Sequence, residues 1–213
     1  MIEIKNLSVK FKDKVIYDNF NISFEENKIT AILGKSGTGK TTLFNVLCGT
    51  ISYTGEIVNN YPEKSMVYSS PRLITTMTVE ENLKFILKND SYIDILKELN
   101  LYDSKDKYPD ELSSGMAQRV SLIRAFLFNA KIVLMDEPTV NLDISLKYKL
   151  LNMFLSLWNK QKPTTLVISH SVRDAMYIAD NIIIIDNNKV VLNIKNDKSD
   201  KTEKLIIDTI TSL

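Results

Sequence analysis

The sequence lacks the features that mark a secreted or membrane-spanning chain. Its 213 residues include one cysteine, Cys48, which excludes an internal disulfide and favours a reducing, cytoplasmic setting. The first residues alternate as in a strand, without the basic start and apolar core of a signal peptide. The longest apolar run, residues 182–185, is far shorter than the ~20 residues that cross a bilayer. Any role at a membrane must therefore depend on a partner.

An excess of charge of either sign is also missing. The 27 basic and 26 acidic residues give a formal net charge of +1, so no overall field attracts nucleic acid or anionic lipid. We find no internal repeat and no low-complexity segment. The hydrophobic content of 44% supports a sizeable core, and the chain is expected to fold as a globular protein.

A glycine-containing loop follows an apolar, β-branched run at residues 29–33, and a helical pattern continues at residues 43–47. The loop reads Gly34, Lys35, Ser36, Gly37, Thr38, Gly39, Lys40, Thr41 and Thr42. It fits the pattern G-x-x-x-x-G-K-[ST], in which backbone N–H groups and a helix N-terminus bind a polyphosphate. Lys40 is expected to reach the β and γ phosphates, and the Thr41 hydroxyl to bind magnesium. A glycine-rich turn that binds nothing is the alternative, which the flanking strand and helix disfavour.

Strand patterns cover residues 2–10 and 15–24, around a polar turn at residues 12–14, and predict an N-terminal antiparallel β subdomain. Further short strands are expected at residues 55–58 and 65–68. The aromatic Phe11 stands beside the first turn. It either stacks on an adenine ring or covers the sheet as an ordinary apolar residue, and its position alone favours neither.

The pattern becomes helical between about residues 70 and 125. Thr78, with Glu81 three residues later, predicts a capped helix start. Two apolar stripes at helical spacing predict packing faces: Val79, Leu83, Ile86 and Leu87, then Tyr92, Ile95, Leu96 and Leu99. These features indicate a helical subdomain inserted in a mixed α/β core.

Strands and helices alternate again from residue 131, which predicts parallel strands with covering helices. The expected elements are a strand at 132–135, a helix at 142–158, a strand at 164–169, a hairpin of 181–186 with 189–194 around Asn187-Asn188, and a helix at 205–210. We therefore expect one α/β domain spanning residues 1–213.

Two acids, Asp136 and Glu137, end the predicted strand 132–135. In such a sheet they emerge at the edge where a phosphate loop also opens. Asp136 can hold magnesium through a water, and Glu137 can orient or deprotonate an attacking water. Adjacent acids often merely end a surface strand, but the phosphate loop favours the catalytic interpretation.

Between the loop and the acids, residues 112–116 read Leu-Ser-Ser-Gly-Met. Taken alone, they form a polar turn before an apolar helix. The three motifs in this order resemble the nucleotide-binding subunits of ABC transporters, whose signature is LSGGQ or LSGGM. The resemblance covers nearly the whole chain and implies a P-loop NTPase core that binds ATP and magnesium. It also implies a head-to-tail dimer, in which Ser113, Ser114, Gly115 and Met116 of one copy close over the ATP of the other.

Other positions match the family as well. Phe11 falls at the adenine-stacking aromatic, and His170 falls at the switch histidine that reads the γ phosphate, although Ser171 replaces the usual Asp. Residues 140–143, Val-Asn-Leu-Asp, occupy the D-loop with Val-Asn in place of Ser-Ala.

The sharpest departure is at residues 68–73, Tyr-Ser-Ser-Pro-Arg-Leu, which resemble the family's Q-loop with Ser69 in place of glutamine. Ser69 would reach magnesium through a bridging water. With Ser114 in place of a signature glycine, this implies slower hydrolysis with ATP binding less affected.

The resemblance implies an ATP-hydrolysing subunit of a membrane transport complex, with Lys40, Glu137 and His170 as catalytic residues. Such a subunit is cytoplasmic, lies on the inner face of the membrane, pairs with a second identical or different ATPase subunit, and works with separately encoded permease subunits. Three stretches, residues 71–73, 108–112 and 116–119, look most like the importers of the nitrate, sulfonate and taurine group. An importer also implies a solute-binding protein. No nucleic-acid partner is expected. Two alternatives stay open: a regulatory subunit with weak ATPase activity, and a soluble clamp acting on nucleic acid or ribosomes.

Overall fold

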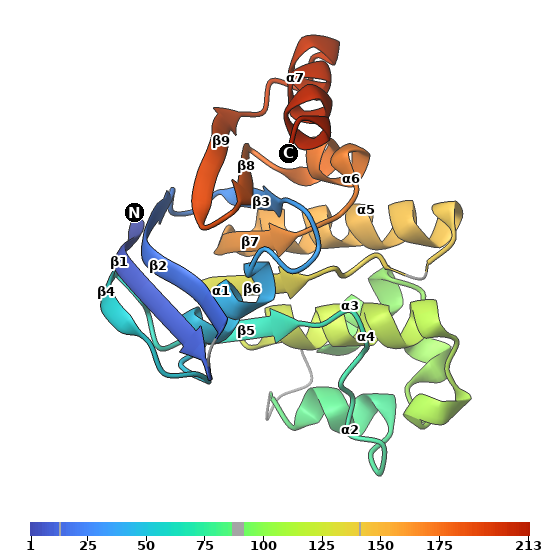
Figure 1. The fold of residues 1–213 in the computed structure, drawn as a ribbon. Coiled ribbons are helices and arrows are strands. Elements are labelled where there is room, and N and C mark those ends of the chain that lie inside the picture. Colours follow the sequence, from blue (N-terminus) through green and yellow to red (C-terminus); the bar gives the residue numbers. More distant parts are fainter. Residues whose placement is uncertain (13, 87–91, 141) are drawn as a thin grey trace. The chain divides into compact units, whose positions relative to one another are not determined.

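The computed structural model describes residues 1–12, 14–86, 92–140 and 142–213 (Figure 1). The described chain divides into two compact units. The first unit comprises Met1–Lys64 and Thr164–Leu213, and the second comprises Ser65–Pro163. Among the described residues, no helix combines the length and the apolar character that crossing a membrane requires.

The first unit contains a three-stranded antiparallel sheet in the order β2-β1-β4. Its strands are β1 (Ile2–Phe11), β2 (Lys14–Phe24) and β4 (Thr54–Val58). Alternation along β1 buries Ile2, Ile4, Leu7 and Val9, each 2% exposed or less. The predicted antiparallel strand pair is confirmed, while the turn residue Asp13 lies outside the described residues.

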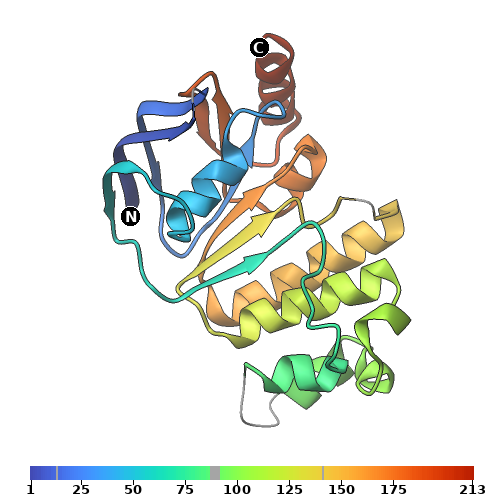
Figure 2. The ribbon, with the colours of Figure 1, turned by 60° about the horizontal axis from the view of Figure 1, so that its bottom comes forward.

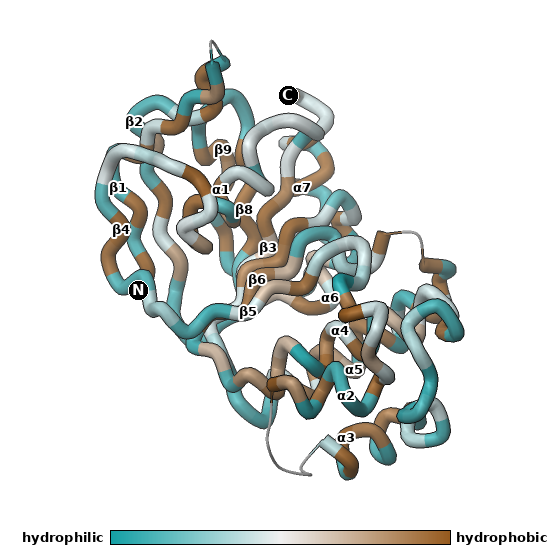
Figure 3. The backbone as a smooth tube through the Cα atoms, turned by 90° about the horizontal axis from the view of Figure 1, so that it is seen from below, coloured by the Kyte–Doolittle hydropathy of each residue, from teal (hydrophilic) through white to brown (hydrophobic). Residues whose placement is uncertain are grey.

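The first unit also contains strands in the order β7-β3-β8-β9. β3 (Ile29–Leu33) pairs in parallel with β7 (Thr164–Ile168) and β8 (Asn181–Asp186), and β9 (Lys189–Lys195) returns antiparallel to β8. The predicted hairpin around Asn187-Asn188 is confirmed. β3, β7 and β8 are buried along their whole lengths, as expected for parallel strands covered on both faces, and Figure 3 shows β3 and β8 as mainly hydrophobic.

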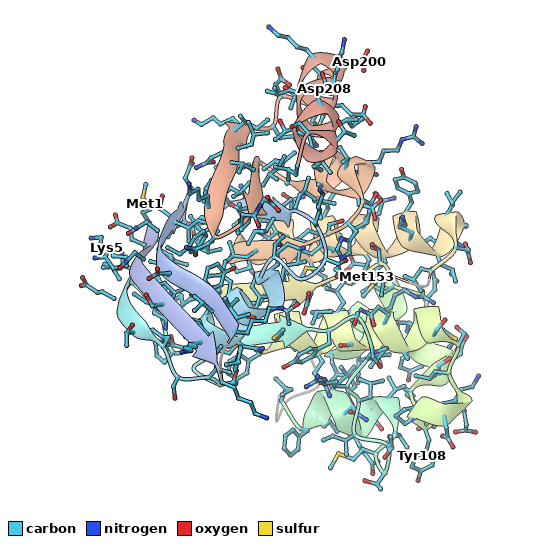
Figure 4. The ribbon with its side chains drawn as sticks, viewed as in Figure 1. Met1, Lys5, Tyr108, Met153, Asp200 and Asp208 are labelled. Atoms are coloured by element: carbon cyan, nitrogen blue, oxygen red, sulfur yellow. The ribbon has the colours of Figure 1, made fainter. Side chains whose placement is uncertain are left out.

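The described residues of the first unit also form the helices α1 (Lys40–Leu47), α6 (Val172–Ile178) and α7 (Asp200–Thr211). α6 packs against β3 and α7, and α7 also contacts β9. Charged side chains such as Lys5 on β1 and Asp200 and Asp208 on α7 extend outward (Figure 4). The phosphate loop joins the end of β3 to the start of α1.

In the second unit β5 (Lys64–Val67) lies beside β6 (Ile132–Asp136). Its helices are α2 (Val79–Lys84), α3 (Tyr92–Glu98), α4 (Ser114–Leu127) and α5 (Ile144–Gln161), with short 3-10 turns at Tyr102–Ser104 and Pro109–Glu111. α4 packs along α5 (Figure 2), where the rings of Phe126 and Phe154 meet edge to face at 5.9 Å. Met153, labelled in Figure 4, is buried on α5.

Several helix boundaries differ from the expected ones. α5 begins at Ile144 instead of residue 142, because the Asp143 carboxylate caps it by accepting a 2.9 Å hydrogen bond from the Leu146 N–H. α2 ends at Lys84, so Ile86 lies beyond the helix, and Leu87 lies outside the described residues. The capping box of Thr78 and Glu81 is confirmed. α6 was not expected, because seven residues are too few to give a clear periodic pattern.

Asparagine takes the place of glycine in many turns of this chain. The sequence holds six glycines, and several of them have positive φ. Among the described residues, the asparagines with positive φ are Asn6, Asn19, Asn27, Asn59, Asn100, Asn129, Asn187 and Asn188. Asparagine tolerates the left-handed region better than most residues, so it can end strands and helices here.

Candidate functional site

The phosphate loop of the first unit folds around the Lys40 ammonium group. Lys40 is 5% exposed, and its Nζ donates hydrogen bonds to the carbonyl oxygens of Gly34 (2.9 Å) and Lys35 (2.7 Å). Nζ also lies 3.4 Å from Thr38 Oγ1. The charged group is thereby fixed at the mouth of the loop, where an anion would meet it.

Two glycines of the loop are required by close contacts. Gly34 has φ 145°, and a Cβ there would lie 2.2 Å from the carbonyl oxygen of Ile185 on β8. Gly39 has φ 96°, and its Cβ would lie 2.9 Å from the Tyr17 ring and hydroxyl. β2 and β8 thus confine the loop from two sides, and only glycine fits.

The N-terminus of α1 is well suited to an anion. Gly39 occupies the N-cap position without a side-chain hydrogen bond, and the first turn contains no acidic residue. The helix dipole therefore presents its positive end at Lys40 and Thr41 without a carboxylate to neutralise it. Thr41 is exposed and Thr42 half-buried in that turn.

A cavity of about 540 Å³ borders the loop within the first unit. Residues 14–16, 35–38 and 186–188 line it, together with Leu213. Asn188 holds the β8–β9 turn against β2, since its side chain accepts from the Asp18 N–H at 3.1 Å and donates to the Asp18 carbonyl at 2.6 Å. The volume is within the range of small-molecule sites. Phe11 ends β1, 47% exposed, and is not part of this lining.

His170 follows β7 after one residue and is exposed. The next residue, Ser171, caps α6, because its hydroxyl accepts a hydrogen bond of 3.2 Å from the Asp174 N–H. The serine at this position therefore has a structural use, which the sequence comparison with the family pattern did not predict.

In the second unit Asp136 ends β6 and Glu137 begins the following turn, both half-buried. Glu137 has φ 51°, a left-handed conformation that is uncommon for glutamate. Backbone strain of this kind is concentrated at functional sites. Of the D-loop residues, Val140 is exposed and Asn141 lies outside the described residues.

The signature residues begin α4. The Ser113 hydroxyl accepts a 3.3 Å hydrogen bond from the Met116 N–H, so Ser113 is the N-cap. Ser114 is exposed in the first turn, and Gly115 is buried, where a Cβ would lie 3.1 Å from Leu146 Cδ1. The first turn carries no acidic residue, so this helix start is also compatible with an anion.

Ser69 is exposed in the segment that follows β5. Its neighbours are held firmly: the Arg72 guanidinium carbon lies 3.6 Å from the centre of the Tyr68 ring, and Gln118 Nε2 donates a 2.8 Å hydrogen bond to the Tyr68 carbonyl. Gln118 was not predicted to contribute to the site. Its sequence signals are its place in residues 116–119, which resemble the importer group, and its polar character in an apolar helix, which also fits a surface position.

The candidate residues therefore form two sets, one on each unit. The first unit carries Phe11, residues 34–42 and His170, and the second carries Ser69, residues 113–116, Asp136 and Glu137. Both sets contain a helix N-terminus free of acidic residues in its first turn. Cys48, at the end of α1, is half-buried, and burial raises the pKa of its thiol, which disfavours a reactive role.

Known proteins with similar sequences indicate the family of this chain. Residues 17–140 match the family described as ABC transporter. The aliphatic sulfonates import ATP-binding protein SsuB 1 of Agrobacterium fabrum is 30% identical over 200 residues, which cover 89% of this chain and 72% of that protein. The taurine import ATP-binding protein TauB of Roseobacter denitrificans is 32% identical over 206 residues, covering 86% and 77%.

A solved structure described as the ATP binding subunit of an ABC transporter superposes with a TM-score of 0.82 at 22% identity. The superposition covers 100% of this chain and 98% of the solved chain. This similarity confirms the predicted α/β fold. The chain belongs to the ABC transporter family and is one of its ATP-binding, ATP-hydrolysing subunits.

Proposed function

We propose that ATP binds with its β and γ phosphates on residues 34–42 and with its adenine ring on Phe11. The observation that carries this proposal is the Lys40 ammonium, held 2.9 Å and 2.7 Å from two loop carbonyls at the start of α1. The backbone N–H groups of the loop and the positive end of α1 add to the attraction for phosphate. Phe11, 47% exposed at the end of β1, has a ring face available for stacking.

Magnesium fits the oxygen donors of this chain. Thr41 would bind it directly through its hydroxyl, and Asp136 and Ser69 would hold it through waters. Among the described residues no three His, Cys, Asp or Glu side chains gather in a way that would hold a metal, so nucleotide phosphates and water must supply the other ligands. When bound, the ion neutralises charge on the phosphates.

In the proposed hydrolysis, each catalytic residue has one role. Glu137, half-buried in the turn that follows β6, orients the attacking water and takes its proton. Lys40 and His170 donate hydrogen bonds to the γ phosphate as charge develops on its oxygens. The water, the base and the donors must all be present for turnover.

Two copies form the active unit in this proposal. Ser113, Ser114, Gly115 and Met116 of one copy close over the ATP bound by the partner, so that each α4 N-terminus faces a γ phosphate. We further propose that residues 1–213 form one ABC ATPase domain, with residues 70–125 as its helical subdomain.

The transport task is proposed to be import. Relatives with similar identity are named for import of aliphatic sulfonates, taurine, sulfate or thiosulfate, and Fe(3+) ions. Because these names span several solutes, the proposal includes no particular cargo. The chain would lie on the cytoplasmic face of the membrane against separately encoded permease subunits, with a solute-binding protein outside.

A regulatory subunit with slow turnover is the second candidate. Ser69 and Ser114 favour it, because each replaces a family residue in the machinery. A serine hydroxyl reaches less far than the expected glutamine amide. In this case a second, different ATPase subunit would supply most of the hydrolysis.

The test is Glu137→Gln in the full chain. The variant should bind ATP with magnesium, lose hydrolysis and elute as a dimer in gel filtration. Hydrolysis at the wild-type rate would remove Glu137 from its role. Wild-type protein that binds ATP but turns it over only after a second ATPase subunit is added would support the regulatory candidate.

A further inference from the structure

The segment between β5 and α2, residues 68–78, has no regular secondary structure, yet helix α4 holds it at two points. Gln118 Nε2 donates to the Tyr68 carbonyl at 2.8 Å, and Arg124 donates through Nη2 to the Arg72 carbonyl. Both contacts join side chains of one helix to backbone oxygens of one segment. A shift of α4 would therefore pull the segment with it.

Helix α2 holds the second half of the same segment. Asn82 is 1% exposed; its Oδ1 accepts from the Ile74 N–H at 2.8 Å, and its Nδ2 donates to the carbonyls of Ile74, Met77 and Thr78. Arg124 Nη1 lies 3.4 Å from the same Oδ1. α2, α4 and the segment thus share one hydrogen-bond network, which ties the loop to both helices.

Ser69 lies inside this network without being one of its anchors. It stands between the two carbonyls that α4 holds, and the Arg72 guanidinium stacked on Tyr68 closes the short loop around it. Ser69 itself is exposed. Its backbone position is therefore fixed from α4, while its side chain stays accessible.

The same helix begins at the signature. Ser113 caps α4, and Gln118 follows five residues later, about 7.5 Å along the axis of a regular helix. A helix of this length moves as a rigid rod over such a distance. A displacement at Ser113 is therefore delivered to the Tyr68 carbonyl, next to Ser69.

Gln118 has one unused hydrogen-bonding atom. The residue is 2% exposed, and within the part of the chain that the structure describes nothing donates to its Oε1. A buried acceptor without a donor is unfavourable, so an arrangement that brings a backbone N–H of the segment to Oε1 would be stabilised. The amide is thus suited to holding the segment in a second position.

We infer that Gln118 and Arg124 are positioning residues that join the signature helix to Ser69. Contact of Ser113 with the nucleotide of the partner copy then shifts Ser69 together with α4. This inference rests on the proposed function, since it needs the signature to meet a nucleotide in the dimer. It gives one protomer a way to time its own hydrolysis by the nucleotide that its partner holds.

Gln118→Met tests the link, because methionine keeps the length and loses the donor. We expect kcat for ATP to fall about tenfold while KM stays within about twofold. Gln161→Met is the control: Gln161 Nε2 also donates to a backbone carbonyl, that of Phe126 at 3.1 Å, but away from the segment, and its kcat should not change. An unchanged kcat in Gln118→Met, or equal losses in both variants, would overturn the inference.

Gln118→Glu supplies a readout that a merely structural role would not give. A protonated glutamic acid can donate to the Tyr68 carbonyl, whereas the carboxylate cannot. The activity of Gln118→Glu relative to wild type should therefore rise as pH is lowered. A ratio that stays constant with pH would contradict the link.

Hydrogen exchange separates this inference from the proposed function. In wild type, ATP with magnesium should change the exchange of amides in 69–73 together with those in 113–118. In Gln118→Met only 113–118 should respond. If wild type fails to hydrolyse ATP but shows this pattern, the proposed function fails and the link stands. If wild type hydrolyses ATP and Gln118→Met shows the same exchange changes as wild type, the link fails alone.

Discussion

The ammonium nitrogen of Lys40 lies 2.7 Å from the carbonyl oxygen of Lys35, so the first turn of α1 is tied to the loop that precedes it. Lys40→Ala removes both the charge and this tie. We expect ATP affinity to fall by about a hundredfold or more, measured by titration calorimetry. Lys28→Ala, which removes an exposed lysine paired with Asp180, should bind as wild type does. Equal affinity in Lys40→Ala would show that the loop does not hold the phosphates.

Gly39 and Gly37 form a matched pair. Both have positive φ, but a Cβ at Gly39 would meet Ile16 and Tyr17 at 2.9 Å, whereas a Cβ at Gly37 meets nothing within 4 Å. Gly37→Ala should cost about 1 kcal/mol of backbone strain, and Gly39→Ala a further 1–3 kcal/mol or so from overpacking. Urea unfolding measures both. Equal destabilisation would mean that Tyr17 gives way and does not confine the loop.

Ser69→Gln restores the side chain that the family pattern has. If the short serine limits turnover, the variant should hydrolyse ATP several times faster with little change in KM, because a longer amide reaches the water without a bridge. Steady-state phosphate release measures this. A rate that falls or stays the same would show that the site is adapted to serine.

Thr78 caps α2 by accepting from the Glu81 N–H at 3.2 Å, while the Glu81 carboxylate accepts from the Thr78 N–H at 2.8 Å. Thr78→Ala should lower the free energy of unfolding by about 1 kcal/mol. Thr76→Ala, two residues earlier and exposed, is the control and should stay within about 0.5 kcal/mol of wild type. A loss shared by both variants would point to the segment as a whole.

Asp197 makes stability depend on pH near the start of α7. Hydrogen bonds from the Ser199 hydroxyl (2.7 Å) and N–H (2.9 Å) lower its pKa from 3.8 to about 2. Because the folded pKa lies below the unfolded one, the stabilisation is complete above pH 3.8 and is lost as pH falls toward 2. The difference in thermal midpoint between wild type and Asp197→Asn should shrink over this window. A constant difference would contradict the assignment.

The phosphate loop was predictable because its glycines, lysine and threonine occur at fixed spacing between a strand and a helix. Strand pairs were predictable for the same kind of reason, since alternation in β1 and β2 and the Asn187-Asn188 turn are local signals. α6 was missed because seven residues hold too little periodicity. The start of α5 was placed at residue 142, two residues too early, because Asp143 was counted within the helix although it serves as the N-cap.

The contacts around Ser69 could not be predicted from the sequence. Gln118 and Tyr68 are 50 residues apart, and neither residue type signals a side chain to backbone hydrogen bond. The same holds for Asn82, whose burial depends on how α2 and α4 pack. Long-range polar contacts of this kind arise from tertiary packing, which has no local pattern.

The left-handed turns built from asparagine affect how the protein ages. Asparagine amides are among the thermolabile side chains, and proteins of hyperthermophiles carry fewer of them. Prolonged heating would therefore also act on the amide groups of turns such as Asn187 and Asn188. In storage, the covalent chemistry of these turns is then a route to damage that is separate from unfolding of the core.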